Sequence, residues 1–320
     1  MQTRITSLLN ITYPIIQGGL AHLAYSHLAA AVSNAGGLGQ ITAMSLDGPE
    51  QLKKEIEQIR RKTSKPFGVN FAIGQGRRPY EPMLEVAIEE QVPVVTMTGG
   101  NPKPLLDRLR DTPIKKLVLV ASVRQAQKAE SLGADAVMAV GQEGGGHIGR
   151  DDLGTFVLIP RVVDSVDIPV IASGGIADGR GLLAALAFGA QGIEMGTRFI
   201  ATQECTHAHP VYKRLIVEKS EMDTVVIKRS LGAPGRAINT ALARKIIEME
   251  AKGATYAELK DLISGAANQK LIYEGREEEG FGWAGQGMGL IEDIPTVAQL
   301  IERIVEQARE SLNHCQRSLG

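Results

Sequence analysis

The sequence has few cysteines, few aromatic residues and no excess of either charge. Two cysteines, Cys205 and Cys315, cannot build a disulfide framework, and they fit a reducing compartment. Lys and Arg total 35 against 36 Asp and Glu, so the formal charge of -1 gives no field suited to a nucleic-acid or anionic-membrane partner. With 43% hydrophobic and 22% charged residues, the composition excludes a disordered or fibrous chain of this length, 320 residues.

Residues 5–46 contain no Lys, Arg, Asp or Glu, so a membrane span or signal peptide has to be considered first. Polar residues and the pairs Gly18-Gly19 and Gly36-Gly37 interrupt every run that would be long enough to span a bilayer. The basic head, apolar segment and cleavage site of a signal peptide do not occur either. We therefore expect a soluble, cytoplasmic protein whose chain begins inside its own core.

Short apolar runs, each closed by a small or polar residue, recur through the first 200 residues. They are Tyr13–Gln17, Gly39–Thr42, Phe67–Phe71, Val92–Thr96, Leu117–Ala121, Ala134–Val140, Ile168–Ala172 and Gly192–Met195. Continuous apolar runs without alternation are typical of parallel strands that are covered on both faces. The pattern predicts eight parallel strands.

Helical patterns separate these runs. The expected helices are Leu23–Val32, Leu52–Arg61, Pro82–Glu90, Arg124–Leu132 and Gly181–Phe188. Eight strand–helix units favour an α/β fold of the (β/α)8 TIM-barrel type over a doubly wound sheet. A doubly wound sheet would also place a G-x-G-x-x-G fingerprint after its first strand, and Gln17-Gly18-Gly19-Leu20 does not fit it.

About 120 residues follow the eighth strand, too many for one closing helix. Helical periodicity over Ala237–Ala251 and Thr255–Ser264 predicts a small helical insertion, a lid or substrate domain at residues 205–280. Apolar residues at helical spacing predict a last barrel helix over Thr296–Leu312. Residues 1–204 and 281–320 would then form the barrel.

In such barrels the active site lies at the carboxyl ends of the strands, and a phosphate commonly lies after strands 7 and 8. Strand 7 ends at Ser173-Gly174-Gly175, and strand 8 ends at Met195-Gly196-Thr197. Their backbone N–H groups, with helix N-termini behind them, are suited to a phosphate. Glycines that only form tight turns are the alternative.

The densest glycine cluster, residues 141–149, follows strand 6 and includes Gly144-Gly145-Gly146-His147. Three consecutive glycines cost conformational entropy, so we expect the backbone at Gly145 and Gly146 to approach a flat cofactor ring. His147 would then lie at the barrel mouth, where a histidine donates a hydrogen bond to an anionic substrate or accepts a proton. A structural histidine is the alternative.

Two further strand ends carry candidate cofactor contacts. Asn70, at the end of strand 3, offers donors and an acceptor to the imide edge of a flavin, or closes its strand through a local turn. Gln17, Gly18 and Gly19, after strand 1, would place backbone against the ring, or form a tight turn. Trp283, which lies between glycines, packs in the core or caps a bound ring.

Cys205, His207 and His209 form a C-x-H-x-H string that resembles a metal site. Alternate residues of a loop do not by themselves converge, and no fourth ligand stands nearby to complete a tetrahedron. We therefore expect no metal.

Five segments resemble the nitronate monooxygenase family, and equally its relative, the flavin-dependent enoyl-acyl-carrier-protein reductase II. They are Ile15–Gly19, Gly68–Asn70, Glu143–Gly149, Ser173–Gly179 and Met195–Phe199. The resemblance implies FMN on a (β/α)8 barrel, with Asn70, Gly145, Gly175 and Met195-Gly196-Thr197 in contact with FMN, and His147 as the catalytic histidine. Val140 stands where the family tends to have Gln or Glu.

The two branches imply different chemistry. A monooxygenase would oxidise an alkyl nitronate, with the electron passing to FMN and then to O2, whereas the reductase would use NAD(P)H and FMN to reduce an enoyl thioester. The groups Arg77-Arg78, Lys213-Arg214, Lys228-Arg229 and Arg236 either form the basic mouth that the reductase needs or are ordinary solvated residues. Family habit favours the monooxygenase. A phosphosugar isomerase or lyase and a non-catalytic flavin-binding protein stay open, and the sequence is compatible with a homodimer.

Overall fold

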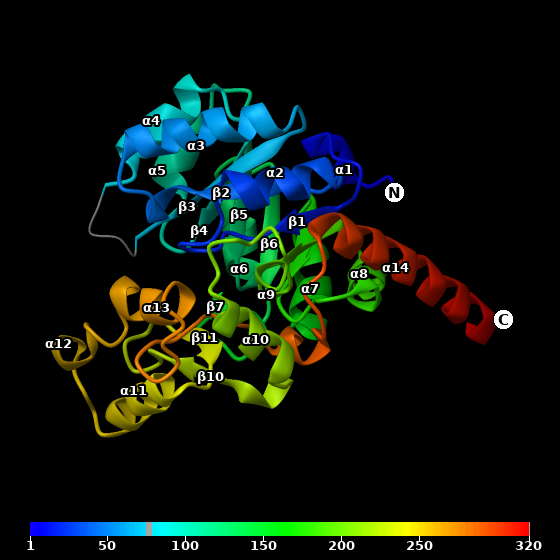
Figure 1. The fold of residues 1–320 in the computed structure, drawn as a ribbon. Helices are drawn as coiled ribbons and strands as arrows, with labels where there is room; N and C mark the ends of the chain where they lie inside the picture. Colours follow the sequence, from blue (N-terminus) through cyan, green and yellow to red (C-terminus); the bar gives the residue numbers. More distant parts are fainter. Residues whose placement is uncertain (75–78, 320) are drawn as a thin grey trace.

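The computed structural model describes residues 1–74 and 79–319. A barrel of eight parallel strands lies at its centre (Figure 1). The strands are β1 (Ile15–Gln17), β2 (Gly39–Thr42), β3 (Phe67–Ala72), β4 (Val94–Thr98), β5 (Lys115–Val120), β6 (Ala136–Val140), β8 (Val170–Ser173) and β9 (Gly192–Met195). The two ends of the sheet, β1 and β2, are joined by a parallel bridge between Ile16 and Leu38, which closes the barrel. The eight predicted strands and the (β/α)8 fold are confirmed.

Helices surround the barrel (Figure 1), including the five expected from the sequence and two, Lys103–Leu109 and Thr155–Val163, that were not expected. They are α2 (Ser26–Asn34), α3 (Pro49–Lys62), α4 (Glu81–Glu89), α5 (Lys103–Leu109), α6 (Val123–Ser131), α7 (Thr155–Val163) and α8 (Gly179–Ala187). A short helix, α1 (Arg4–Leu9), precedes β1, and α9 (Thr197–Ile200) follows β9 directly. The 3-10 turns are η1 (Ala43–Ser45), η2 (Glu221–Asp223) and η3 (Gln286–Leu290).

The inside of the barrel has an apolar lower part and a polar upper part. Side chains alternate between the two faces of a strand, so each strand sends every second residue inward. The lower part is one cluster, in which Ile5 and Leu9 of α1 pack against Ile16, Leu38, Val94, Leu117, Met138 and Ile171. Two residues further along their strands, Gln40, Thr96 and Ser173 are buried polar residues, and Asn70 of β3 and Glu194 of β9 join them. The carboxyl ends of the strands therefore enclose a polar floor.

The chain after β9 contains helices and a β-hairpin. The elements are α10 (Pro210–Glu218), β10 (Thr224–Ile227), β11 (Gly235–Ile238), α11 (Ala241–Ala251), α12 (Tyr256–Leu259) and α13 (Gly265–Ile272). The helical insertion is confirmed, but a helix starting at Ala237 is wrong. Ala237 is part of β11, and α11 starts after Thr240, whose side chain accepts a hydrogen bond from the backbone N–H of Ala243. The lid boundaries at 205 and 280 stay a prediction.

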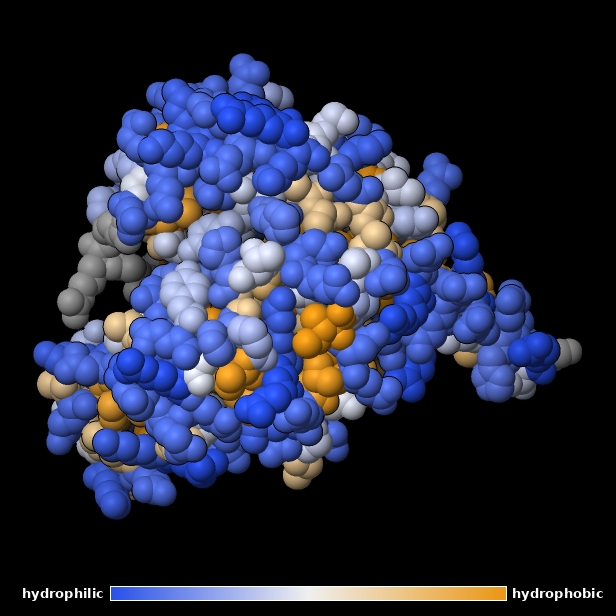
Figure 2. All heavy atoms as spheres, in the orientation of Figure 1, coloured by the Kyte–Doolittle hydropathy of each residue, from blue (hydrophilic) through white to orange (hydrophobic). Residues whose placement is uncertain are grey.

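The last helix, α14 (Val297–Leu319), packs its apolar face on α8 and α2. Its buried residues end at Ala308, and the rest projects beyond the barrel (Figure 1). Hydrophilic side chains cover α14 and α3, while hydrophobic ones gather where the insertion meets the barrel (Figure 2). Among the described residues, no helix combines the length and apolarity needed to cross a membrane.

Candidate functional site

A histidine from the barrel and a lysine from the insertion form a hydrogen-bonded pair. His147 lies on β7 (Gly146–His147), a short strand in the glycine-rich loop after β6. β7 pairs with β11, so that the barrel loop and the hairpin form one three-stranded sheet. Lys228 follows β10, and its Nζ lies 2.7 Å from Nε2 of His147. The pair therefore exists only because the insertion reaches over the barrel.

Trp283 covers this pair. The Lys228 Nζ lies 5.0 Å from the centre of the Trp283 ring, and the His147 ring lies 5.3 Å from it. A cation over an aromatic face is stabilised by the quadrupole of the ring. Lys228 is only 8% exposed, whereas the side chain of His147 is exposed. His147 thus presents the accessible end of the pair.

The backbone of Lys228 is held in a conformation that a side chain rarely adopts. Its φ is 63°, in the left-handed region, which costs a non-glycine residue free energy. The Glu250 carboxylate of α11 compensates, because it accepts hydrogen bonds from the backbone N–H of Lys228 at 2.8 Å and of Ser230 at 2.9 Å. These hydrogen bonds stabilise the strained backbone that brings the ammonium group to His147.

The environment changes the protonation of both members. Burial lowers the pKa of Lys228 to about 8, against the opposing effect of Glu250. Desolvation by the surrounding protein, and next the charge of the Lys228 ammonium, lower the pKa of His147. His147 is then neutral at pH 7 while Lys228 is mostly charged. Because an ammonium group can only donate, Nε2 of His147 accepts and its proton resides on Nδ1.

Glycines of three loops meet beside this pair. A Cβ atom built on Gly145 would lie 2.5 Å from the backbone nitrogen of Gly285, so only glycine fits there. Gly174 and Gly175 have φ of 92° and 72°. The backbone N–H of Gly285 donates to Oγ1 of Thr197 at 3.0 Å. The predicted residues after β6, β8 and β9 are therefore brought together.

The polar floor is a chain of hydrogen bonds. The Asn70 amide donates to Oγ1 of Thr96 at 2.9 Å, and that hydroxyl donates to Oε1 of Gln40 at 2.5 Å. The Gln40 amide in turn donates to the backbone carbonyl of Gln17 at 2.7 Å. These bonds fix the orientation of Asn70, which lies directly under Gly19.

The other predicted cofactor contacts differ in how accessible they are. Gln17 is fully buried, and its Oε1 accepts the backbone N–H of Gln40, so its side chain is part of the barrel wall. Met195 is 2% exposed and belongs to the core between barrel and helices. Gly146 has open space where a Cβ would be, while Gly18 is buried and Gly19 is exposed.

The expectation that helix N-termini back the phosphate loops is wrong for α8. Asp178 caps this helix, and its carboxylate accepts the backbone N–H groups of Arg180 at 2.9 Å and Gly181 at 3.3 Å. A capping carboxylate occupies the place of an anion and repels it. A phosphate at Gly174 and Gly175 would depend on the loop backbone instead.

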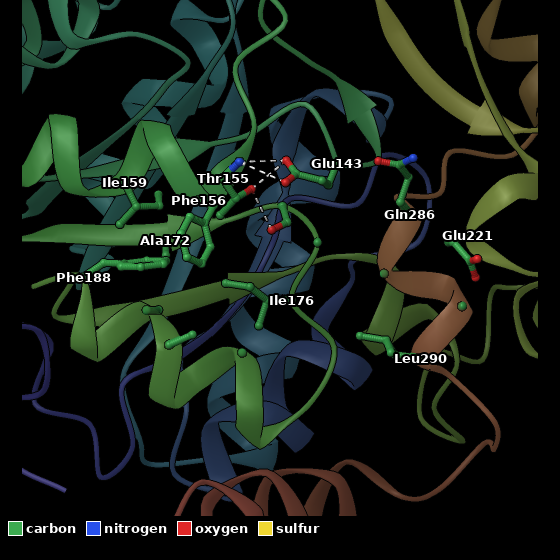
Figure 3. A pocket seen from close by; sticks show the side chains of 17 residues that line it. Glu143, Thr155, Phe156, Ile159, Ala172, Ile176, Phe188, Glu221, Gln286 and Leu290 are labelled. Carbon is green, nitrogen blue, oxygen red and sulfur yellow. Dashed lines mark hydrogen bonds between the residues drawn. The ribbon is translucent and has the colours of Figure 1, made fainter. Parts of the chain in front are cut away.

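A cavity of about 380 Å³ lies between α7 and α8 (Figure 3). Phe156, Ile159, Ile176 and Phe188 form its apolar side. The carboxylate of Glu143 faces it from the glycine-rich loop and is held by the N–H and hydroxyl of Thr155 (Figure 3). His147, Lys228 and Trp283 do not line this cavity, whereas Gly174 and Gly175 do. The paired residues define the more favourable site for chemistry.

Cys205, His207 and His209 do not converge. Cys205 is buried, the His207 ring packs against Tyr25, and Nδ1 of His209 accepts the backbone N–H of Val211. Across residues 1–74 and 79–319, no three His, Cys, Asp or Glu side chains gather as a metal site would require.

Two of the basic residues considered for a basic mouth, Lys213 and Arg236, bind backbone carbonyls instead. Arg77 and Arg78 lie outside the described residues. Lys213 donates to the carbonyl of Thr202, and Arg236 donates to the carbonyl of Gln142. The role of Lys228 was missed, although the β-branched run Thr224–Ile227 before it is a sequence signal for a strand end.

Comparison with known proteins agrees with the barrel and its glycine loops. The nitronate monooxygenase family model matches residues 2–78 and 71–307. A probable nitronate monooxygenase of Staphylococcus saprophyticus is 34% identical over 98% of this chain and 99% of its own. A carboxyl-CoA dehydrogenase of Rhodococcus jostii, which acts on a hydroxy-methyl-oxo-octahydroindene acyl group, is also 34% identical, over 96% of both chains. The structure of FabK from Thermotoga maritima is 44% identical, with a TM-score of 0.94 over 99% of both chains.

The fold, the glycine loops and these matches define an oxidoreductase built on a TIM barrel. The chain belongs to the nitronate monooxygenase family. Its members and neighbours carry different names, so the reaction has to be argued from the site.

Proposed function

We propose that this protein is an FMN-dependent reductase that uses NAD(P)H to reduce the double bond of an enoyl thioester. The Lys228–His147 pair carries the proposal, because reduction of a carbon–carbon double bond consumes a proton as well as a hydride. An alkyl nitronate is already an anion and needs no proton donor. A pair that can deliver a proton near neutral pH therefore fits the reductase better.

The residues present fit a bound flavin. Gly19 is exposed, Gly146 has open space where a Cβ would be, and Asn70 lies beneath Gly19 with its carboxamide held in place. Gly174, Gly175, Gly196 and Thr197 provide loop backbone for the phosphate of FMN. When bound, the flavin supplies the two-electron redox chemistry, and the protein supplies position and protons.

The proton route follows from the tautomer of His147. Nδ1 of His147 gives its proton to the α-carbon of the substrate, and Nε2 takes a proton from the Lys228 ammonium. The sequence of transfers leaves His147 neutral and Lys228 as a free amine, so Lys228 is the net donor. A donor with a pKa of about 8 is well matched to this task, because general acids work best near the operating pH.

The second candidate is oxidation of an alkyl nitronate with O2, favoured by the family model and by the curated relative from Staphylococcus saprophyticus. The ammonium of Lys228 would then bind the anionic substrate. This arrangement is less favourable, since Lys228 is buried beneath Trp283 and behind His147. The 44% identity to FabK also supports the reductase, as does the relative that acts on a CoA thioester.

The test is anaerobic stopped-flow absorbance of the FMN-loaded protein, mixed separately with NADH, NADPH and an alkyl nitronate. We expect fast bleaching by one nucleotide and recovery of the flavin colour on addition of crotonyl-CoA or an enoyl-acyl-carrier protein. Reduction by the nitronate, with no response to either nucleotide, would refute the reductase and establish the second candidate. A protein that binds no FMN would refute both.

A further inference from the structure

The last helix, α14, carries an apolar stripe that is longer than the barrel surface it covers. Val305 and Ala308 are among its buried residues, and Leu312, Cys315 and Leu319 continue the series at alternating steps of four and three residues. Residues seven or eleven positions apart lie within about 20° of each other around an α-helix, so the stripe keeps one direction. This spacing is that of the seam between two helices of a coiled coil.

The part of the stripe beyond Ala308 is open to solvent. Residues 309–319, the tail of α14, project past the barrel (Figure 1). Leu312 is 44% exposed, Leu319 is 89% exposed, and Cys315 is exposed as well. A helix normally turns such a stripe toward a core or a second helix, so the tail has an apolar face suited to a partner helix.

The spacing of the tail residues makes this face complementary to itself. If Leu312 faces Cys315 of a second, antiparallel copy, the same register sets Ala308 against Leu319, because each of these two residues lies four positions further out. Each layer then joins one leucine to one small residue, which fills the seam evenly. A two-fold axis relates the copies, so every layer occurs twice. The occupant that fits is a second copy of this chain.

The barrel decides the direction of the second helix. In a parallel pair, residues 297–308 of the second copy would need the space that α8 and α2 of the first copy fill. In the antiparallel pair, the second helix covers the stripe only beyond Ala308, and its Leu319 reaches the edge of the first barrel. The length of the tail therefore matches the separation of the two barrels.

The flanks of the seam carry no opposing charges. In the tail they are Arg309, Ser311, Gln316 and Ser318. In the antiparallel register Arg309 faces Gln316, and Ser311 faces Ser318. Since flanking residues set partner choice in coiled coils, the absence of facing like charges on these flanks permits pairing with an identical helix.

We propose that this protein forms a homodimer in which the α14 tails of two copies pair as an antiparallel two-helix coiled coil. So short a contact lies at the low end of interface sizes, and we expect a Kd on the order of 10 μM. The inference does not depend on the flavin, the substrate or the proton route.

The first test is analytical ultracentrifugation of wild type, Leu312→Arg and Asn313→Arg at about 1 to 300 μM, a range that brackets the expected Kd. The wild-type mass should rise from the 34.3 kDa of one chain toward twice that value. Leu312→Arg places a charge in both leucine–cysteine layers and should stay at the mass of one chain. Asn313→Arg adds the same charge outside the seam and should behave as wild type. Arginine is a good helix former, so both variants should keep the helix, which circular dichroism verifies.

The second test examines the register by oxidation with diamide in a Cys315→Ser background. Ala308→Cys and Leu319→Cys together should give a covalent dimer on a non-reducing gel. Either substitution alone should give none, because equivalent positions 308 or 319 of the two copies lie about 16 Å apart along the helix axis.

Three results would overturn the proposal. Wild type could keep the mass of one chain over the whole range, or Leu312→Arg could still dimerise, which would mean that another surface holds the copies together. Equal crosslinking by the single and the double cysteine variants would exclude the antiparallel register. None of these measurements uses turnover, so a wrong reaction and a wrong interface are distinguishable.

Discussion

Lys228 should set the alkaline limb of the pH–rate profile. Because burial lowers its pKa to about 8, the ammonium form falls from about 90% of the protein at pH 7 to about 9% at pH 9. If Lys228 is the net proton donor, kcat/KM for the enoyl thioester should fall about tenfold over that range. His147 adds no limb there, since it stays neutral throughout.

The assay is steady-state oxidation of NAD(P)H with an enoyl thioester between pH 6 and 10, on wild type, Lys228→Met and Lys228→Arg. The Met variant removes the donor and should lose about 10²- to 10⁴-fold in rate, with no limb near pH 8. The Arg variant keeps the charge but holds its proton too tightly, so it should be slow and equally flat. Reduction of FMN by the nucleotide alone should be unaffected in both variants.

The reasoning fails if the wild-type profile is flat up to pH 9.5. It fails equally if Lys228→Met keeps the limb, because another group would then be the donor. A Met variant with normal kcat and a raised KM for a nitronate would indicate that Lys228 binds an anion instead.

Other substitutions test the site and the fold. Gly145→Ala places a Cβ against the backbone of Gly285 and should abolish FMN binding, measured by fluorescence, while the Cβ of Gly48→Ala meets nothing and should leave FMN binding intact. Phe199→Ala empties a fully buried site and should cost about 3–5 kcal/mol in a denaturant titration. Asp178→Ala removes the cap of α8 and should cost about 0.5–2 kcal/mol by the same measurement, and an Asp178→Asn control, which can still cap, should cost less. Because the pKa of Lys228 is lower in the folded protein, the unfolded state binds more protons between about pH 8 and 10. The free energy of unfolding of wild type should therefore rise relative to that of Lys228→Met as the pH increases through this window. A decrease in that difference would contradict the prediction.

The barrel was predictable because its strands are buried on both faces. Runs such as Leu117–Ala121 and Ile168–Ala172 have no alternation, and the structure places a strand of the parallel sheet in each of them. A run does not tell which of its residues point into the barrel, so the structure was needed to place Glu194 on the polar floor.

The insertion was harder to predict because its strands depend on a distant partner. β11 pairs with β7 across about 90 residues of chain, and β10 is an edge strand of only four residues. No local pattern fixes that register, so the contact between Lys228 and His147 follows from tertiary structure alone. Gln17 shows the opposite case, since its position at a strand end suggested a ligand contact and its side chain instead closes the barrel wall.

The proposed proton donor, Lys228, belongs to the insertion and not to the barrel. The strands of the barrel hold the polar floor, whereas the hairpin and Glu250 fix the backbone of Lys228. Exchanging the segment between β9 and Trp283 among relatives would therefore change proton delivery while leaving the electron-transfer machinery in place. If the proposed function holds, divergence within this family has a simple route, because exchange of a segment of about ninety residues would decide whether a substrate is protonated.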